Sequence, residues 1–71
     1  MSKNGREKVG RLLKKLREQK GLDQYELADQ IGVSQGTISN IESGKRKVQA
    51  NIAITLAKFF DVDFHKFVSD E

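Results

Sequence analysis

Amides and hydroxyls are the side chains best able to do chemistry in this chain, and they are concentrated in one short segment. Residues 34–43 hold a glutamine, an asparagine, a threonine and three serines, but only one charged residue, Glu42. Residues 45–47 then add three consecutive cations. Amides and hydroxyls donate and accept hydrogen bonds, while clustered cations attract a polyanion. The segment is therefore suited to recognising a polar, negatively charged surface.

Residues that could support catalysis or bind a metal are scarce. The chain has no cysteine and one histidine, His65. Thiolate nucleophiles, disulfides and cysteine-based zinc sites are excluded, and one histidine supplies at most one metal ligand. We interpret His65 as a partly exposed surface side chain, and we see neither a nucleophile beside a base nor a phosphate-cradling loop. We expect no enzyme, no cofactor, no metal and no small-molecule substrate.

The charges are segregated along the chain. Its net charge is +3, and residues 1–20 hold eight lysines or arginines against two glutamates. Residues 21–44 hold four acids and no lysine or arginine. Basic blocks on both sides of an acidic middle suit a polyanion held at its edges, if folding brings the blocks to one face.

Nothing in the sequence indicates a membrane partner or export. The longest apolar stretches fall far short of the roughly 18 residues that a membrane-spanning helix needs. The N-terminus also lacks the apolar segment of a signal peptide. We therefore expect a soluble, cytoplasmic protein of bacterial or phage origin.

The spacing of apolar residues predicts an all-α domain of five helices. Val9, Leu12, Leu13 and Leu16 follow helical spacing, and no strand-like alternation appears. Without a repeat or a linker, residues 1–71 are expected to form one domain, ordered from about residue 5 to about residue 68. The predicted helices cover about residues 5–19, 23–31, 35–43 and 49–60, followed by a short fifth helix that ends near Val68.

Capping residues indicate where these helices begin and end. Two pairs have the spacing of a capping box, in which two side chains accept hydrogen bonds from backbone N–H groups at a helix start. Two glycines supply the left-handed conformation that ends a helix. The pairs are Asn4 with Glu7 and Asp23 with Glu26, and the glycines are Gly21 and Gly32. Ser34 and Asp63 are expected to cap later helices, whereas Gln49 is a poor cap for the helix that follows it.

The connection between the second and third predicted helices is very tight. Gly32 adopts positive φ at no steric cost, Val33 fills the corner, and Ser34 already caps the next helix. Ala28 must be small, because the third helix crosses the second one there. This geometry holds the third helix outward with a polar, almost uncharged surface. Such a helix fits the major groove of DNA, which is about 12 Å wide.

Several short segments together form a specific pattern. They are Leu22-Asp23-Gln24, Glu26-Leu27-Ala28, Ile31-Gly32-Val33-Ser34, Thr37-Ile38-Ser39, Ile41-Glu42 with Gly44-Lys45, and Leu56-Ala57. The pattern spans nearly the whole chain and resembles the helix-turn-helix domain shared by lambdoid phage repressors, Cro proteins and many small bacterial regulators. The resemblance implies a five-helix lambda repressor-like domain with its helix-turn-helix motif at about residues 23–43. It also implies a transcriptional regulator, of repressor type, that binds double-stranded DNA.

The resemblance assigns DNA contacts to individual residues. Gln24 matches a position that contacts a backbone phosphate, and Gln35 matches the leading reader of bases, where an amide can pair with both N7 and N6–H of adenine. Asn40 matches another groove-facing polar position. The loop cations match a segment that meets the sugar-phosphate backbone. The full set of expected DNA-binding residues is Gln24, Ser34, Gln35, Gly36, Thr37, Ser39, Asn40, Ser43, Lys45, Arg46 and Lys47, with Arg11 and Lys14 as further candidates.

Three departures from the family pattern matter. Gly36 stands where the family often has a long polar reader, so either the helix approaches the bases closely there, which we favour, or it reads fewer bases. Val48 and Gln49 replace the usual proline and capping residue. The loop at residues 45–49 is therefore expected to be mobile until DNA orders it. Ser34 is interpreted as a structural cap first and a DNA contact second.

The resemblance also implies an internal ion pair, and the apolar residues suggest a dimer. Arg17 matches an arginine that bridges to the glutamate matched by Glu42, and this pair is expected to be architectural. The fourth helix is expected to bury one apolar stripe, formed by Ala50, Ala53, Leu56, Ala57 and Phe60. Ile52 and Phe59 lie outside this stripe, so they are expected to be exposed and to form a homodimer interface with Phe64, Phe67 and Val68. Two copies would then bind a palindromic operator, with one third helix in each half-site.

Two alternatives remain open. The apolar residues at the chain end could close the domain's own core instead, which leaves a monomer. A protein-binding module on the same scaffold, such as an antitoxin-like or anti-repressor partner, would use the exposed apolar residues more than the third helix.

Overall fold

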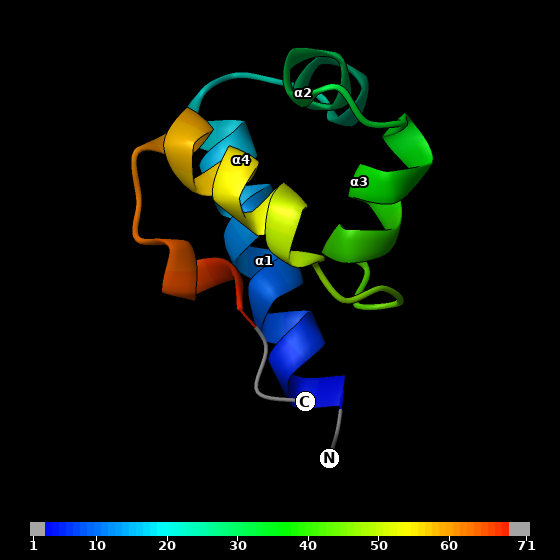
Figure 1. Ribbon diagram of the computed structural model, residues 1–71. Coiled ribbons are helices and arrows are strands. Elements are labelled where there is room, and N and C mark those ends of the chain that lie inside the picture. Colours follow the sequence, from blue (N-terminus) through cyan, green and yellow to red (C-terminus); the bar gives the residue numbers. More distant parts are fainter. Residues whose placement is uncertain (1–2, 69–71) are drawn as a thin grey trace.

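The computed structural model describes residues 3–68, which contain four α-helices and one short 3-10 helix joined by loops (Figure 1). The helices are α1 (Lys3–Gln19), α2 (Gln24–Ile31), α3 (Gln35–Glu42), α4 (Ala50–Phe60) and the 3-10 helix η1 (Phe64–Phe67). The predicted all-α class is confirmed, but the fifth element is a 3-10 turn and not an α-helix. Four residues are too few for a regular α-helical ladder. The prediction of loose chain ends concerns residues outside the described range.

The capping pattern was correct at α2 and wrong at α1. Asp23 Oδ1 accepts from the backbone N–H of Glu26 at 2.7 Å, and Glu26 Oε1 accepts from the N–H of Asp23 at 2.9 Å. Asn4 instead lies inside α1, which already includes Lys3 and so passes through the predicted cap. α4 begins at Ala50 after Gln49, whose side chain makes no capping hydrogen bond, as its residue type predicted.

The core lies where the helices meet, and apolar side chains from every element reach it. The largest fully buried side chains are Leu13, Leu27, Ile38, Ile41, Leu56 and Phe67. Ile38 and Ile41 face inward as predicted, so α3 is anchored along one side only. Figure 1 shows α3 at one edge of the molecule and η1 at the opposite edge, with α1 and α4 between them.

Three positions differ from the exposure expected on α4 and η1. Ile52 is 8% exposed, because it lies one helical turn before the fully buried Leu56 and shares its face. Phe67 is completely buried, because η1 folds back against α4 and closes the core. Ala50, expected in the buried stripe, is exposed at the first position of α4.

α1 and α3 cross unusually closely at Gly10. A Cβ atom added to Gly10 would lie 2.5 Å from the carbonyl oxygen of Ile41 and 2.6 Å from that of Glu42. Both atoms belong to backbone, which cannot rotate away. A residue without a side chain is therefore required here, and this contact fixes how deeply α3 sits against α1.

No helix among residues 3–68 is long and apolar enough to cross a membrane.

Candidate nucleic-acid interface

The corner before α3 sets the direction of that helix. Gly32 ends α2 in the left-handed conformation, with φ +77° and ψ 34°, and its N–H bonds to the carbonyl of Ala28. Ser34 then begins α3, because its Oγ accepts from the N–H of Thr37 at 3.1 Å. Val33 packs against the core between the two helices. One glycine and one cap thus reverse the chain within three residues, as the sequence predicted.

The outer side of α3 is polar and carries no charge. Gln35, Gly36, Asn40 and Ser43 are exposed. At Gly36 an added Cβ would meet only Ser34 Oγ, at 3.8 Å, so packing within the protein does not require glycine there. Thr37 and Ser39 are half-buried at the sides of the helix. The exposed strip thus carries one amide at its start, on Gln35, and another near its end, on Asn40. Gly36, between these two residues, adds no side chain to the strip.

Several hydroxyls expected to contact DNA already have partners within the protein. Thr37 Oγ1 lies 2.9 Å from Ser34 Oγ and accepts from the Arg46 guanidinium at 3.4 Å. Ser43 Oγ donates to the carbonyl of Asn40 at 3.2 Å. The Arg46 contact joins the loop after α3 to the helix, and the other two lie within α3 and its caps. Ser34 therefore acts as a structural cap, whether or not it also touches a phosphate.

Arg17 and Glu42 form a buried ion pair beneath this surface. Arg17 Nε donates to Glu42 Oε2 at 2.7 Å, and Arg17 Nη2 donates to Glu42 Oε1 at 3.1 Å. The Arg17 side chain is 10% exposed and that of Glu42 is 4% exposed. The hydrogen bond to Glu42 raises the pKa of Arg17 above its ordinary value, although burial opposes the shift. A third bond, to the carbonyl of Leu22 at 2.7 Å, attaches the start of α2 to the pair.

The ion pair continues into a chain of amides that reaches the surface. Gln24 Nε2 donates to Glu42 Oε1 at 3.1 Å, and Gln24 Oε1 accepts from Gln35 Nε2 at 3.4 Å. Gln24 is half-buried and Gln35 is exposed. The sequence suggested the ion pair and the two glutamines separately. It did not suggest that one carboxylate joins them, because residues 24 and 42 come together only when α2 packs against α3.

The basic loop is attached to the end of α3. The backbone N–H groups of Lys45 and Arg46 both donate to the carbonyl of Asn40, at 3.0 and 3.2 Å. Lys45 and Lys47 are exposed, Arg46 is half-buried, and Val48 is buried. The loop thus continues the polar strip of α3 with three cations. Its expected mobility stays a prediction.

α1 contributes one more cation to this side of the molecule. Lys14, Arg17, Gln24, Ser39, Glu42 and Ser43 line a shallow pocket between α1, α2 and α3. Lys14 is exposed at its edge. Arg11 lines only a different, open hollow along α1, which Lys14 also lines. The geometry therefore favours Lys14 over Arg11 as a neighbour of the polar strip.

Fewer apolar residues are free for a partner than the sequence suggested. Phe59 is half-buried, with its ring edge-on to Phe60 at 5.0 Å and Lys20 Nζ 5.4 Å from its centre. Phe64 is half-buried as well. Val68 is 42% exposed, and Ile54, which the sequence reading missed, is 46% exposed. One turn away on its own helix, Ile54 has only two alanines, Ala50 and Ala57, as apolar neighbours, and this lack of a large apolar neighbour was the missed signal.

A family model described as a helix-turn-helix, HTH_3, matches residues 13–67, which include every element after the first part of α1. The chain belongs to the HTH_3 family. This family is of the Cro/C1 type, as the residue pattern indicated. The matched range contains both the tight corner and the ion pair.

Relatives and solved structures agree with this assignment. The chain is 42% identical over 52 residues to a putative HTH-type transcriptional regulatory protein of Thermococcus kodakarensis, and the match covers 73% of this chain and 16% of that protein. The chain thus spans about one sixth of the length of the curated relatives it matches. The restriction-modification controller protein C.AhdI of Aeromonas hydrophila is 29% identical, with a TM-score of 0.81 and coverage of 92% of this chain and 94% of that one. The clp gene regulator ClgR of Corynebacterium glutamicum is 27% identical, with a TM-score of 0.77 and coverage of 87% and 66%.

Proposed function

We propose that this chain binds double-stranded DNA with sequence specificity, and that it regulates transcription as a repressor by placing α3 in the major groove. One observation carries the proposal: α3 has an uncharged polar strip on its outer side and runs directly into three cations. Hydrogen-bonding groups can read base edges, while cations bind any phosphate. The two requirements of specific DNA recognition thus lie next to each other on one side of the fold.

The proposal divides the candidate residues into two roles. Gln35 and Asn40, with exposed amides, read bases, and α3 approaches the bases most closely at Gly36. Lys45, Arg46 and Lys47 bind the backbone on one side of the groove, and Lys14 extends this contact on the other. Gln24, at the start of α2, binds a phosphate where free N–H groups favour an anion. Ser34, Thr37, Ser39 and Ser43 are the remaining candidates, through the hydroxyl capacity left by their internal contacts.

We further propose that two copies bind one palindromic site. A single domain of this size offers few base contacts, and linking two half-sites about 34 Å apart raises the affinity of the pair. The apolar surface that supports this is a shallow groove at the C-terminal end of the fold, lined by Ile54, Ala57, Lys58, Asp61, Val62 and Phe64. Exposed Val68 follows η1. This surface replaces Ile52 and Phe67 in the expected interface, because both are buried within the domain.

Selection from random duplexes, followed by sequencing, tests the proposal directly. We expect an enriched motif with two-fold symmetry, which gives half-site and spacing together. Sedimentation at micromolar concentration then reports the oligomeric state with and without the selected duplex. Enrichment of one asymmetric half-site by a protein that sediments as a monomer would contradict the dimer, and absence of any motif would contradict specific binding.

The salt dependence of affinity separates this function from a protein-binding module. A contact that neutralises several phosphates releases counterions, so affinity should fall by orders of magnitude between about 50 and 200 mM salt. Docking of an apolar partner would depend little on salt. No contact in the described residues specifically favours the protein-binding alternative.

A further inference from the structure

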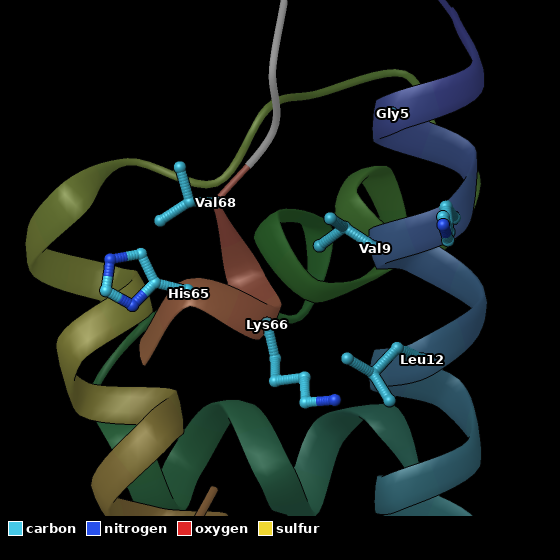
Figure 2. A pocket seen from close by; sticks show the side chains of 7 residues that line it. Gly5, Val9, Leu12, His65, Lys66 and Val68 are labelled. Atoms are coloured by element: carbon cyan, nitrogen blue, oxygen red, sulfur yellow. The ribbon is translucent and has the colours of Figure 1, made fainter. Parts of the chain in front are cut away.

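A groove separates the first half of α1 from η1, at the edge of the molecule away from α3. It has a volume of about 410 Å³ and is lined by Gly5, Lys8, Val9, Leu12, His65, Lys66 and Val68. In Figure 2, Val9 and Leu12 extend from α1 toward η1, and the Lys66 side chain runs from η1 in the direction of Leu12. Pockets that hold small molecules have volumes of about 300–1,000 Å³.

The lining combines an apolar wall with cations. Gly5, Val9, Leu12 and Val68 offer carbon surface, and Lys8 and Lys66 bring an ammonium group from each side. Both lysines are exposed, so their charge is held at the edge and not in the core. None of the seven lining residues is an acid. Asp63, which caps η1, is already bonded to the His65 ring at 2.9 Å.

The groove lies on the opposite side of α1 from α3. Gly10 faces α3, since a Cβ atom added to it would point at the carbonyls of Ile41 and Glu42. Lys8 and Leu12 are each two residues from Gly10, which is about 200° around a helix of 3.6 residues per turn. A ligand in the groove would therefore leave the polar strip and the basic loop uncovered.

We infer that this groove binds an amphipathic organic anion, meaning a carboxylate on an unbranched apolar body. The apolar body would lie along Val9, Leu12 and Val68, and the carboxylate would accept hydrogen bonds from Lys8 and Lys66. Charge complementarity selects an anion, and the limited volume selects a small molecule over a folded partner. The ligand is bound and not transformed. The inference does not rest on the DNA contacts, because none of the proposed DNA-contacting residues lines the groove; Val68 is the one residue it shares with the proposed dimer surface.

Decanoate, below its micelle concentration, is the probe that tests this site. We expect its addition to change amide chemical shifts at residues 5–12 and 64–68, and not in α3. Acetate, which has the carboxylate without the apolar body, and decyltrimethylammonium, which has the chain with the opposite charge, should each bind far more weakly. Equal binding of decanoate and decyltrimethylammonium would overturn the inference.

Matched charge variants locate the site. The double variant Lys8→Gln with Lys66→Gln should weaken decanoate binding by about tenfold, since bonds to charged groups are lost. The double variant Lys15→Gln with Lys20→Gln removes the same charge from exposed positions outside the groove and should leave binding unchanged. Equal weakening by both pairs would mean a nonspecific effect of net charge and would overturn the inference.

A DNA duplex separates this site from the proposed function. The amide chemical-shift changes caused by decanoate should persist when a saturating amount of duplex is present. The affinity of the protein for decanoate should then be unchanged within about twofold. Displacement of decanoate by DNA would overturn the separate site while leaving DNA binding intact. Binding of decanoate by a protein that binds no duplex would overturn only the proposed function.

Discussion

The amide of Gln24 is oriented by Glu42. Its Nε2 donates to Glu42 Oε1 at 3.1 Å, and the same oxygen accepts from Arg17 at 3.1 Å. A carboxylate only accepts hydrogen bonds, so the amino group of Gln24 must face it. The carbonyl of Gln24 consequently faces Gln35, which donates to it at 3.4 Å. One N–H and the carbonyl of Gln35 remain free, and these are the two groups that pair with adenine.

Gln24→Met should therefore weaken base discrimination while leaving the fold nearly unchanged. Methionine keeps the length of the side chain but removes both hydrogen bonds, so Gln35 loses its support. We expect discrimination between the selected duplex and one altered at the Gln35 position to fall by about 0.5–1.5 kcal/mol. Gln30→Met, on the exposed side of the same helix, is the matched control. If the control lowers discrimination equally, the amide chain has no role in base reading.

Gln35→Ala and Lys45→Ala should separate reading from nonspecific attraction. The Gln35 variant should lose about 1–3 kcal/mol on the selected duplex and little on random DNA. The Lys45 variant should weaken binding to both duplexes alike. It should also reduce the slope of log affinity against log salt concentration by about 1, because one phosphate contact is lost. Fluorescence anisotropy titrations measure the affinity of each variant for each duplex, and repeating them at several salt concentrations gives the salt dependence. Parallel losses for both variants on both duplexes would refute the assigned roles.

Glu42→Ala should damage the fold before it affects DNA contacts. It leaves the Arg17 guanidinium buried without its partner, which costs about 3–5 kcal/mol for a buried pair. Urea denaturation measures this loss. Glu18→Ala, an exposed acid on α1, is the control and should change stability by no more than about 0.5 kcal/mol. Replacing both partners, with Arg17→Met and Glu42→Leu, should recover most of the loss. A double variant no more stable than Glu42→Ala would contradict the account.

Residue types with strong local preferences made most of the fold predictable. The Asp23–Glu26 box, the left-handed Gly32 and the Ser34 cap all act within three or four residues, so their spacing in the sequence already contains their geometry. The inward direction of Ile38 and Ile41 followed from helical periodicity. The family pattern added the pairing of Arg17 with Glu42, which no local rule supplies.

What the sequence could not supply depends on packing between distant segments. Ile52 was expected on the surface because the predicted apolar stripe covered too small a part of the surface of α4. In the structure, both η1 and α2 pack against α4. From the sequence, Phe67 could equally close the core or contact a second copy. It closes the core because η1 packs back against α4. The role of Gly10 depends on carbonyl groups some thirty residues later, so nothing near it in the sequence indicated a close crossing.

Gly10→Ala and Gly36→Ala should have opposite effects on stability. At Gly10 the new methyl group would meet two backbone carbonyls within 2.6 Å, so α1 and α3 must move apart, at a cost of about 1–3 kcal/mol. At Gly36 the methyl group meets nothing closer than 3.8 Å, and alanine should stabilise the helix by up to about 1 kcal/mol. Thermal denaturation compares the two variants directly. Destabilisation by Gly36→Ala would show that packing within the domain requires this glycine.

The same Gly36 variant distinguishes the two reasons for a glycine on the recognition surface. If α3 approaches the bases closely there, the added methyl group should lower affinity for the selected duplex by about 1–3 kcal/mol, although the protein itself is more stable. Gly21→Ala is unsuitable as a control, because Gly21 has φ +72°. Gln30→Ala, at an exposed position of α2 outside the proposed DNA contacts, is preferable. Unchanged affinity of the Gly36 variant would mean that this position simply reads no base.

Acidification should loosen η1 through its cap, Asp63. The backbone N–H of His65 donates to Asp63 Oδ1 at 2.8 Å, and this bond, with that of the His65 ring, lowers the pKa of Asp63 below its ordinary value. A lowered carboxyl pKa stabilises the fold above the unfolded value of about 3.9, and the contribution is lost as pH falls through the lower folded value. Between about pH 5 and pH 2, the amide shift of His65 should therefore move toward that of a disordered peptide, and the melting temperature should fall. Asp63→Asn keeps a capping oxygen without the titrating proton, so its His65 amide should stay nearly constant over this range. An identical pH response in both proteins would assign the change to other carboxylates.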